Sequence, residues 1–319
     1  MKRLRIGTRG SALALWQANF IAERLREYGG AEIEIVRIHT SGDHLQNAAV
    51  AKPLAEYGAE AISKGIFIKE LEDALLSGTV DVAVHSMKDV PTTIPAQLAF
   101  CAITQREDPR DCLISRQGRT LKTLPYGARV GTSSLRRQAQ LRHHRPDLEL
   151  AELRGNVDTR IKKLEAGEYD AIVLAMAGVN RLGLAGKITQ VLDEEIMLPA
   201  VGQGALGIET RADDAETSRL VAQLDHAETR ACVSAERAVL RALQGGCQIP
   251  LGALAHVRGE ALHLEAAVFS PRGSEHVESS DEGPVAEAEG IGARLGAALI
   301  EAGADNILRM AGRSIGHGL

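Results

Sequence analysis

A run of basic residues is the part of this sequence whose residue types most clearly indicate chemistry. Between residues 131 and 163, and counting Arg129 just before them, the chain has nine lysines and arginines against four acidic residues, although its net charge is -5. A Thr-Ser-Ser sequence at 132–134 is typical of a helix N-cap and places Arg136 and Arg137 in the first helical turn. Cations there oppose the helix dipole unless an anion binds the exposed N–H groups. The segment therefore indicates either an anion site or a solvated basic face.

Two further strand-to-helix junctions carry the same residue types. A predicted strand at 4–7 leads into Arg9 and Ser11 before a helix, and a later strand leads into Arg154, with Arg160 in the first turn of the helix that follows. Ligands of open α/β sheets bind outside the carboxyl ends of the strands, so we expect the three junctions to converge on one crevice. The ligand should carry several negative charges.

Asp89 is the candidate for acid–base chemistry. A buried strand is predicted at 80–84, and Ser86, Lys88 and Asp89 follow at its carboxyl end before Pro91. A carboxylate at that position can transfer a proton or stabilise a positive charge. The alternative is an aspartate whose oxygens accept hydrogen bonds from turn N–H groups, as is common before proline.

The four cysteines show no spacing typical of a disulfide framework or a zinc site. Cys101, Cys112, Cys232 and Cys247 form no CxxC pair, so we expect neither a bound metal nor a disulfide. From composition alone each is expected to be a small buried residue. Cys247 follows two glycines and is predicted to lie on a loop, which leaves an accessible thiol and an inert one as alternatives.

Length and periodicity predict an α/β protein with more than one domain. The chain has 319 residues, 45% hydrophobic and 25% charged, and its alternating strand and helix patterns are typical of mostly parallel sheets. The polar stretch 104–110 and the region 198–204 are the candidate crossings between two lobes, and a small α+β region follows from about residue 222. The first helix is predicted to place these apolar residues on one face: Leu13, Trp16, Phe20, Ile21 and Leu25.

The sequence GQGALG at 202–207 matches the glycine fingerprint of a dinucleotide site. It lacks the required context, because no clear strand precedes it and a strand rather than a helix is predicted after it. We therefore predict that Gly202 and Gly204 allow the backbone to turn at the second crossing.

Taken together, these residues resemble the hydroxymethylbilane synthase (porphobilinogen deaminase) family. Eight motifs in the family's order, from Gly7 to Ala255, carry the resemblance: GTRGSALALWQ, KGIFIKELE, VHSMKDVPT, GTSSLRRQAQL, LRGNVDTR, AGVNRLGL, LPAVGQGALGIE and GGCQIPLGALA. The resemblance implies two lobes like those of periplasmic binding proteins, with mixed, mostly parallel sheets, and a small C-terminal α+β domain. The corresponding boundaries are 1–104 completed by 203–222, then 105–202, then 223–319.

The resemblance also implies the activity. The family condenses four porphobilinogen molecules head to tail onto a dipyrromethane primer, releases four ammonia molecules, and hydrolyses the product to hydroxymethylbilane, an intermediate of tetrapyrrole and haem biosynthesis. The primer is implied to be attached through Cys247, and Asp89 to be the catalytic residue. Each pyrrole carries two carboxylates, for which arginine is suited because its guanidinium is planar and always charged.

The remaining site residues follow from the same motifs. The residues implied to bind the cofactor are Lys88, Ser86, Thr132, Ser134, Arg136, Arg137, Arg160 and Gly204. Those implied to bind substrate are Arg9, Ser11, Lys64, Arg154, Arg181 and Gln203. The chain departs from the family pattern between Leu54 and Lys64, where it has Glu56 and about four extra residues, and we expect the stretch 44–63 to be a lid over the cleft.

Other classes of protein fit the sequence less well. A non-catalytic, two-lobed polyanion-binding protein would use the same arginines, but it leaves Asp89 and the loop cysteine unexplained. Nucleic-acid binding is not expected, because the chain is acidic overall and 3% aromatic. The N-terminus lacks an apolar signal region and no run is long enough to span a bilayer. We therefore expect a cytoplasmic monomer that passes its product to uroporphyrinogen-III synthase.

Overall fold

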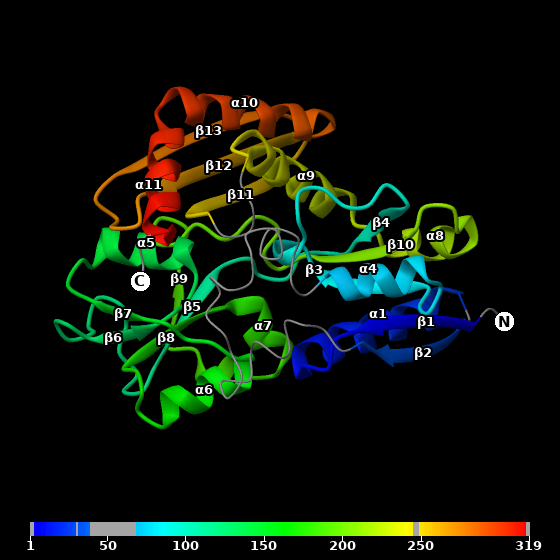
Figure 1. Ribbon diagram of the computed structural model, residues 1–319, viewed down its shortest axis with the longest axis horizontal. Helices are drawn as coiled ribbons and strands as arrows, with labels where there is room; N and C mark the ends of the chain where they lie inside the picture. Colours follow the sequence, from blue (N-terminus) through cyan, green and yellow to red (C-terminus); the bar gives the residue numbers. More distant parts are fainter. Residues whose placement is uncertain (1–2, 30, 39–67, 245–248, 317–319) are drawn as a thin grey trace. The chain divides into compact units, whose positions relative to one another are not determined.

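The computed structural model describes residues 3–29, 31–38, 68–244 and 249–316 (Figure 1). The chain divides into two compact units, Met1–Glu107 with Ala205–Arg230, and Asp108–Gly204 with Ala231–Leu319. The chain therefore passes between units after Glu107, after Gly204 and after Arg230. The first two passages lie at or beside the two predicted crossings. The division into three domains is not tested by this result and stays a prediction.

The first unit is built on a five-stranded sheet with helices on both faces. The strand order is β2 (Glu32–Arg37), β1 (Arg3–Thr8), β3 (Val82–Ser86), β10 (Leu206–Arg211) and β4 (Leu98–Ile103). Strand β1 pairs in parallel with β2 and β3, whereas β10 is antiparallel to both its neighbours. Helices α1 (Ala12–Gly29) and α8 (Ala215–Val221) share one apolar core with the sheet, and α4 (Lys69–Leu76) packs in a separate core formed with Val80, Ala83 and Leu98.

The apolar face predicted for α1 is partly wrong. Ile21 and Leu25 are fully buried, but Trp16 is 36% exposed and stacks on Phe20 with ring centroids 5.3 Å apart. Small residues of the same helix, Ala18 and Ala22, take the buried positions against the sheet. An aromatic side chain at a helical spacing did not by itself indicate the buried side.

The second unit contains a five-stranded sheet with the same arrangement. The order is β7 (Glu149–Ala151), β6 (Arg129–Gly131), β8 (Ala171–Ala175), β5 (Asp111–Ser115) and β9 (Gln190–Leu192), and β5 is the strand antiparallel to its neighbours. Helix α5 (Leu135–His144) packs in one core of this sheet, and α6 (Val157–Glu165) and α7 (Met176–Arg181) in another.

A three-stranded antiparallel sheet completes the second unit. It consists of β11 (Leu251–Arg258), β12 (Ala261–Phe269) and β13 (His276–Pro284), and it shares an apolar core with α9 (Ala227–Ala242), α10 (Ala288–Glu301) and α11 (Ala304–Gly316). The sequence did not predict β13, because its residues HVESSDEGP are almost all polar. Two mixed, mostly parallel sheets and one small α+β region confirm the predicted fold class.

Candidate active site

Asp89 lies on a tight turn directly after the buried strand β3. The turn is the short 3-10 helix η2 (Met87–Asp89), and its first residue anchors it, because Met87 is 2% exposed and its N–H donates to the Ala205 carbonyl at 3.0 Å. A side chain at Gly207 would collide with Met87 and Phe100. Gly207 on β10 thus leaves room for the buried side chain of Met87. Asp89, two residues after Met87, is exposed.

Five polar residues of the first unit line one small cavity at this turn. They are Arg9, Gln17, His85, Ser86 and Asp89. Ser86 Oγ accepts a hydrogen bond from Gln17 Nε2 at 3.1 Å. The cavity therefore combines a guanidinium and a carboxylate with neutral hydrogen-bonding groups, and it brings Arg9, Ser86 and Asp89 together as expected from the sequence.

Ser11 caps the start of α1, and its predicted contact with substrate stays a prediction. Its Oγ accepts from the N–H of Ala14 at 3.2 Å, the side-chain contact of a helix N-cap. Gln17 is a candidate that the sequence analysis missed. Gln17 lies on α1 and is 5% exposed. The one signal in the sequence was its position four residues after Leu13, which places both residues on the same side of the helix.

His85, which lines the cavity, forms a buried pair with Glu209. His85 Nε2 is 3.0 Å from Glu209 Oε2, and the two side chains are 2% and 0% exposed. The ring of Phe100 packs edge-on against His85 with centroids 5.8 Å apart. Glu72 on α4 has its pKa raised to about 7, because burial and the nearby negative charge of Glu209 oppose its ionisation. Strand β3, which leads into the Asp89 turn, is thus held by buried polar contacts as well as by backbone hydrogen bonds to its neighbouring strands.

In the second unit, α5 begins as predicted from the Thr-Ser-Ser sequence. Ser134 is the N-cap, and its side chain accepts from the N–H of Arg137. Thr132, 1% exposed, accepts from the N–H of Ser134 at 3.3 Å. The two hydroxyl residues therefore hold the first turn of the helix in place.

Arg136 and Arg137 are buried, so the alternative of a solvated basic face is wrong for this pair. They are 4% and 6% exposed, and both bind the carboxylate of Asp111 at the start of β5. The two guanidiniums hold the pKa of Asp111 well below its usual range, against the effect of burial. The carboxylate of Asp111 thus pairs with the two arginines in the first turn of α5. Binding of a ligand carboxylate by the same arginines stays a prediction.

The remaining predicted residues of the second unit contact backbone carbonyls or surface carboxylates. Arg160 Nε donates to the Gly155 carbonyl at 2.7 Å, and Arg154 pairs with the exposed Glu152 at 3.0 Å. Arg181 donates to the Gly204 carbonyl at 2.7 Å. These contacts keep the guanidiniums close to the ends of the strands they follow.

The glycine-rich segment is a turn, as predicted. Gly202 and Gly204 have φ values of 70° and 92°, a region that favours glycine. Strand β10 follows these glycines, whereas a dinucleotide site requires a helix at that position. The structure therefore lacks the context of a dinucleotide site. Gln203 between them is 1% exposed and donates to the Pro109 carbonyl at 2.6 Å and to Asp111 Oδ1 at 2.9 Å.

Two of the predicted site residues and the predicted lid cannot be placed. Lys64, Cys247 and the stretch 44–63 lie outside the residues that the structure describes. The three described cysteines form no disulfide, and Cys112 and Cys232 are buried. Burial and the charge of Asp111 raise the pKa of the Cys112 thiol to about 12, which makes it unreactive.

Comparison with known proteins identifies the family. A profile described as "porphobilinogen deaminase, dipyromethane cofactor binding domain" matches residues 4–219, and one described as the C-terminal domain of porphobilinogen deaminase matches residues 230–301. The chain belongs to the porphobilinogen deaminase family. The predicted transferase of tetrapyrrole biosynthesis, acting on porphobilinogen with a dipyrromethane cofactor, is thereby confirmed, and the non-catalytic alternative is not supported.

Relatives match over nearly the whole chain. The porphobilinogen deaminase of Pelotomaculum thermopropionicum is 50% identical over 98% of this chain and 98% of its own length. That of Geobacter metallireducens is 49% identical over 96% of this chain and 94% of its own length. Among solved structures, a putative methionine-binding lipoprotein from Bacillus subtilis aligns with 70% of this chain and 90% of its own chain at 14% identity. The TM-score of 0.42 is too low to assign a function from this similarity.

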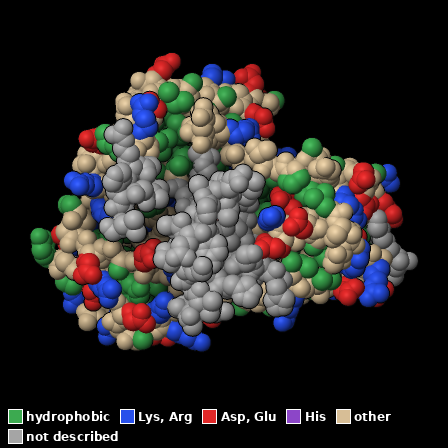
Figure 2. Space-filling model, in the orientation of Figure 1, with side chains coloured by type: hydrophobic (Ala, Val, Ile, Leu, Met, Phe, Trp, Pro, Cys, Tyr) green, Lys and Arg blue, Asp and Glu red, His purple; other side chains and the backbone are tan. Residues whose placement is uncertain are grey.

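Side chains of both charges lie on the surface that one view of the described residues shows. On the face drawn in Figure 2, acidic and basic side chains are interspersed outside the grey atoms. Within the described residues no helix is long and apolar enough to cross a membrane, and no group of His, Cys, Asp and Glu side chains is arranged to hold a metal ion.

Proposed function

We propose that the reaction of this porphobilinogen deaminase is carried out by Asp89, with the arginines of both units binding the carboxylates of substrate and cofactor. One observation supports this most directly. Asp89 is an exposed carboxylate beside Arg9 and Ser86 in a cavity at the carboxyl end of β3, where working residues of α/β proteins are expected.

The described residues fit a ligand with many carboxylates. The side chains proposed for the cofactor are hydroxyls at helix starts, Thr132 and Ser134, together with arginines, Ser86, Lys88 and the backbone at Gly204. Such groups donate hydrogen bonds to carboxylates and supply the positive charge that those carboxylates need. When bound, the dipyrromethane would supply the nucleophilic α-carbon for the first condensation, and the terminal ring of the growing chain would supply it for the later ones.

The chemistry required of Asp89 is electrostatic stabilisation and proton transfer. Loss of ammonia from porphobilinogen leaves a positive charge on the pyrrole nitrogen, and the carboxylate of Asp89 stabilises that charge. After the α-carbon of the chain's terminal ring has attacked, that ring regains aromaticity by losing its α-proton. The same carboxylate accepts this proton and passes it to the released ammonia, which leaves as ammonium. Arg9, Ser11, Lys64, Arg154, Arg181 and Gln203 are proposed to hold the porphobilinogen side chains during these steps.

We also propose that Cys247 is the attachment residue, that the protein is a cytoplasmic monomer, and that hydroxymethylbilane passes to uroporphyrinogen-III synthase. The family resemblance of the GGCQIPLG motif supports the attachment. Intact mass of the denatured chain tests it: the native protein should carry the extra mass of two linked pyrroles, and Cys247→Ala should not. An unmodified native chain that gains no such mass with porphobilinogen or preformed hydroxymethylbilane would disprove the proposal.

Replacement of the carboxylate tests the role of Asp89. Asp89→Asn should fold and carry the cofactor, because the side chain is exposed and keeps its size, but it should lose most of its turnover. A loss of about 100-fold or more is expected for a group with this role. Porphobilinogen consumption by the loaded enzyme is the measurement, and near-normal turnover would refute the assignment.

A further inference from the structure

Asp111 is a fully buried carboxylate without a role in the chemistry proposed for Asp89. It lies at the start of β5 and is 0% exposed. Its Oδ2 is 2.7 Å from Arg136 Nη2, and its Oδ1 is 2.8 Å from Arg137 Nη2. Gln203 Nε2 donates to the same Oδ1 at 2.9 Å. One carboxylate thus contacts two arginines of α5 and the turn at the second crossing.

The charges in this cluster do not balance. The guanidiniums of Arg136 and Arg137 have side-chain exposures of 5% and 7%, and each has Asp111 as its ion-pair partner among the described residues. Two buried positive charges therefore share one negative charge. Leaving a buried charge without compensation is costly in free energy, so the cluster favours the arrival of a further anion.

The hydrogen bonds of the two arginines lead to the same conclusion. Each donates once to a backbone carbonyl, Arg136 to Leu198 at 2.6 Å and Arg137 to Val173 at 3.0 Å. The Nε of Arg137 is buried and has no hydrogen-bond partner in the described part of the chain. The pKa of Arg136 is lowered, because burial and the charge of Arg137 together outweigh the attraction of Asp111. The pair thus has both a surplus charge and an unused donor.

We propose that Asp111 is a positioning residue for cofactor binding: it orients Arg136 and Arg137 at the start of α5 and neutralises one of them, so that the other charge is available to a carboxylate of the dipyrromethane. This inference rests on the proposed function. It adds a residue that does not itself touch the cofactor. Its contact with Gln203 also joins the cofactor arginines to the turn that carries Gly204.

Cofactor uptake by Asp111→Asn is the test. Asparagine has the same size and can still accept hydrogen bonds through its Oδ1, but it has no charge to hold two guanidiniums. Apoprotein is titrated with preformed hydroxymethylbilane, and the adduct is measured by intact mass. We expect the concentration for half-maximal loading to rise by at least about tenfold, the factor for one misplaced charge-assisted hydrogen bond.

Asp147→Asn is the matched control, because Asp147 pairs with Arg145 at the other end of α5 at 2.6 Å. It should load like the native chain. Loading of Asp111→Asn equal to that of the control, with only a lower unfolding temperature of the apoprotein, would mean a purely structural role and would overturn the proposal. Tighter loading would overturn it too, since the carboxylate would then be opposing the cofactor.

A second variant keeps the test decisive if Asp111→Asn does not fold. Asp111→Glu retains the charge and shifts it by one methylene group, so it should fold and still load more weakly than the control. Native-like loading of Asp111→Glu would contradict a positioning role. If the native chain itself gains no two-pyrrole mass, the proposed function fails; if the native chain loads and Asp111 variants load equally well, only this inference fails.

Discussion

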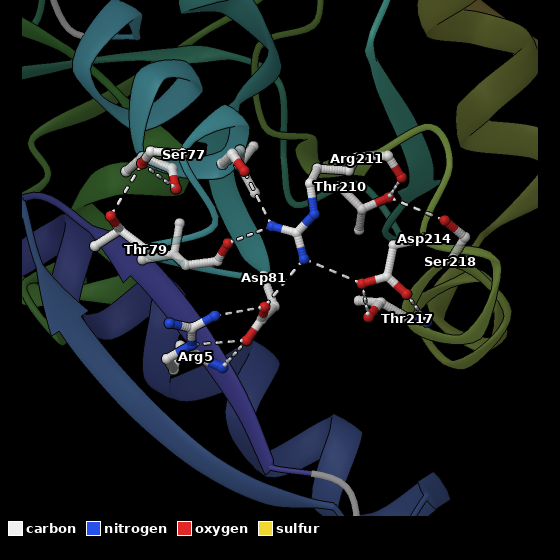
Figure 3. A network of polar contacts seen from close by, with 12 residues as sticks. Arg5, Ser77, Thr79, Asp81, Thr210, Arg211, Asp214, Thr217 and Ser218 are labelled. Atoms are coloured by element: carbon white, nitrogen blue, oxygen red, sulfur yellow. Dashed lines mark hydrogen bonds and ion pairs between the residues drawn. The ribbon is translucent and has the colours of Figure 1, made fainter.

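The partly buried network around Asp81 allows a quantitative prediction about the stability of the first unit. Asp81 precedes β3 and accepts hydrogen bonds from the backbone and guanidinium of Arg5 at 2.9–3.0 Å and from Arg211 Nη2 at 3.1 Å (Figure 3). Its side chain is 13% exposed. The two arginines lower its pKa from 3.8 to about 2, against the opposing effect of burial. Strands β1, β3 and β10 are thus joined through one carboxylate.

The size of the effect follows from that pKa. A carboxyl group whose pKa is lower in the folded state stabilises the fold above its unfolded pKa and loses this contribution as the pH falls towards the folded value. The difference between 3.8 and about 2 corresponds to about 2.5 kcal/mol at pH 7 and about 1.3 kcal/mol at pH 3. Asp81→Asn should therefore lower the free energy of unfolding by about these amounts at the two pH values.

Fluorescence of Trp16 during urea unfolding measures this directly, because Trp16 is the single tryptophan of the chain and lies in the first unit. Glu27→Gln is the control. Glu27 pairs with Arg24 on the surface of α1, and the two side chains are 59% and 48% exposed. It should change the free energy of unfolding by less than about 0.5 kcal/mol. A loss below that size for Asp81→Asn at pH 7, or a loss that does not shrink at pH 3, would refute the reasoning.

Two further predictions concern stability. A Cβ at Gly292 would lie 2.1 Å from the Ala235 carbonyl oxygen, whereas one at Gly290 of the same helix meets only an arginine nitrogen at 3.7 Å; Gly292→Ala should lower the free energy of unfolding by about 1–3 kcal/mol and Gly290→Ala should not. Circular dichroism during urea unfolding compares them, and equal stability of the two variants would contradict the predicted packing. Glu72 has its pKa raised from 4.5 to about 7, so its ionisation reduces stability as the pH rises through that interval. Glu72→Gln should gain about 1–2 kcal/mol over the native chain at pH 8, after discounting for partial exposure, and nothing at pH 4; an equal difference at both values would disprove this.

Local signals in the sequence predicted the elements that carry the site. The Thr-Ser-Ser sequence predicted the N-cap at Ser134, and the apolar run before His85 predicted the buried strand that precedes the Asp89 turn. The failed context of the glycine fingerprint predicted the turn at Gly202 and Gly204. These features depend on neighbours a few residues apart, which a sequence displays directly.

The polar strand β13 and the exposed side of Trp16 were not predictable in the same way. Strand β13 has too few apolar residues to mark a buried face, and it forms because β12 offers it a full ladder of partners. Trp16 is on the outer side of α1 because Ala18 and Ala22 allow the helix to approach the sheet. In both places the packing partner, which is distant in sequence, decided the outcome.

The sequence by itself determined the family, the alternation of strands and helices, and the concentration of arginine at three helix starts. These features depend on ordered motifs and on capping residues that are close together in the chain. Only the tertiary structure decided which charges meet. Asp111 comes 25 and 26 positions before the two arginines that it binds, and His85 and Glu209 are 124 positions apart. A buried charge is stable only beside compensating groups, and the fold supplies these groups by bringing segments that are distant in sequence together.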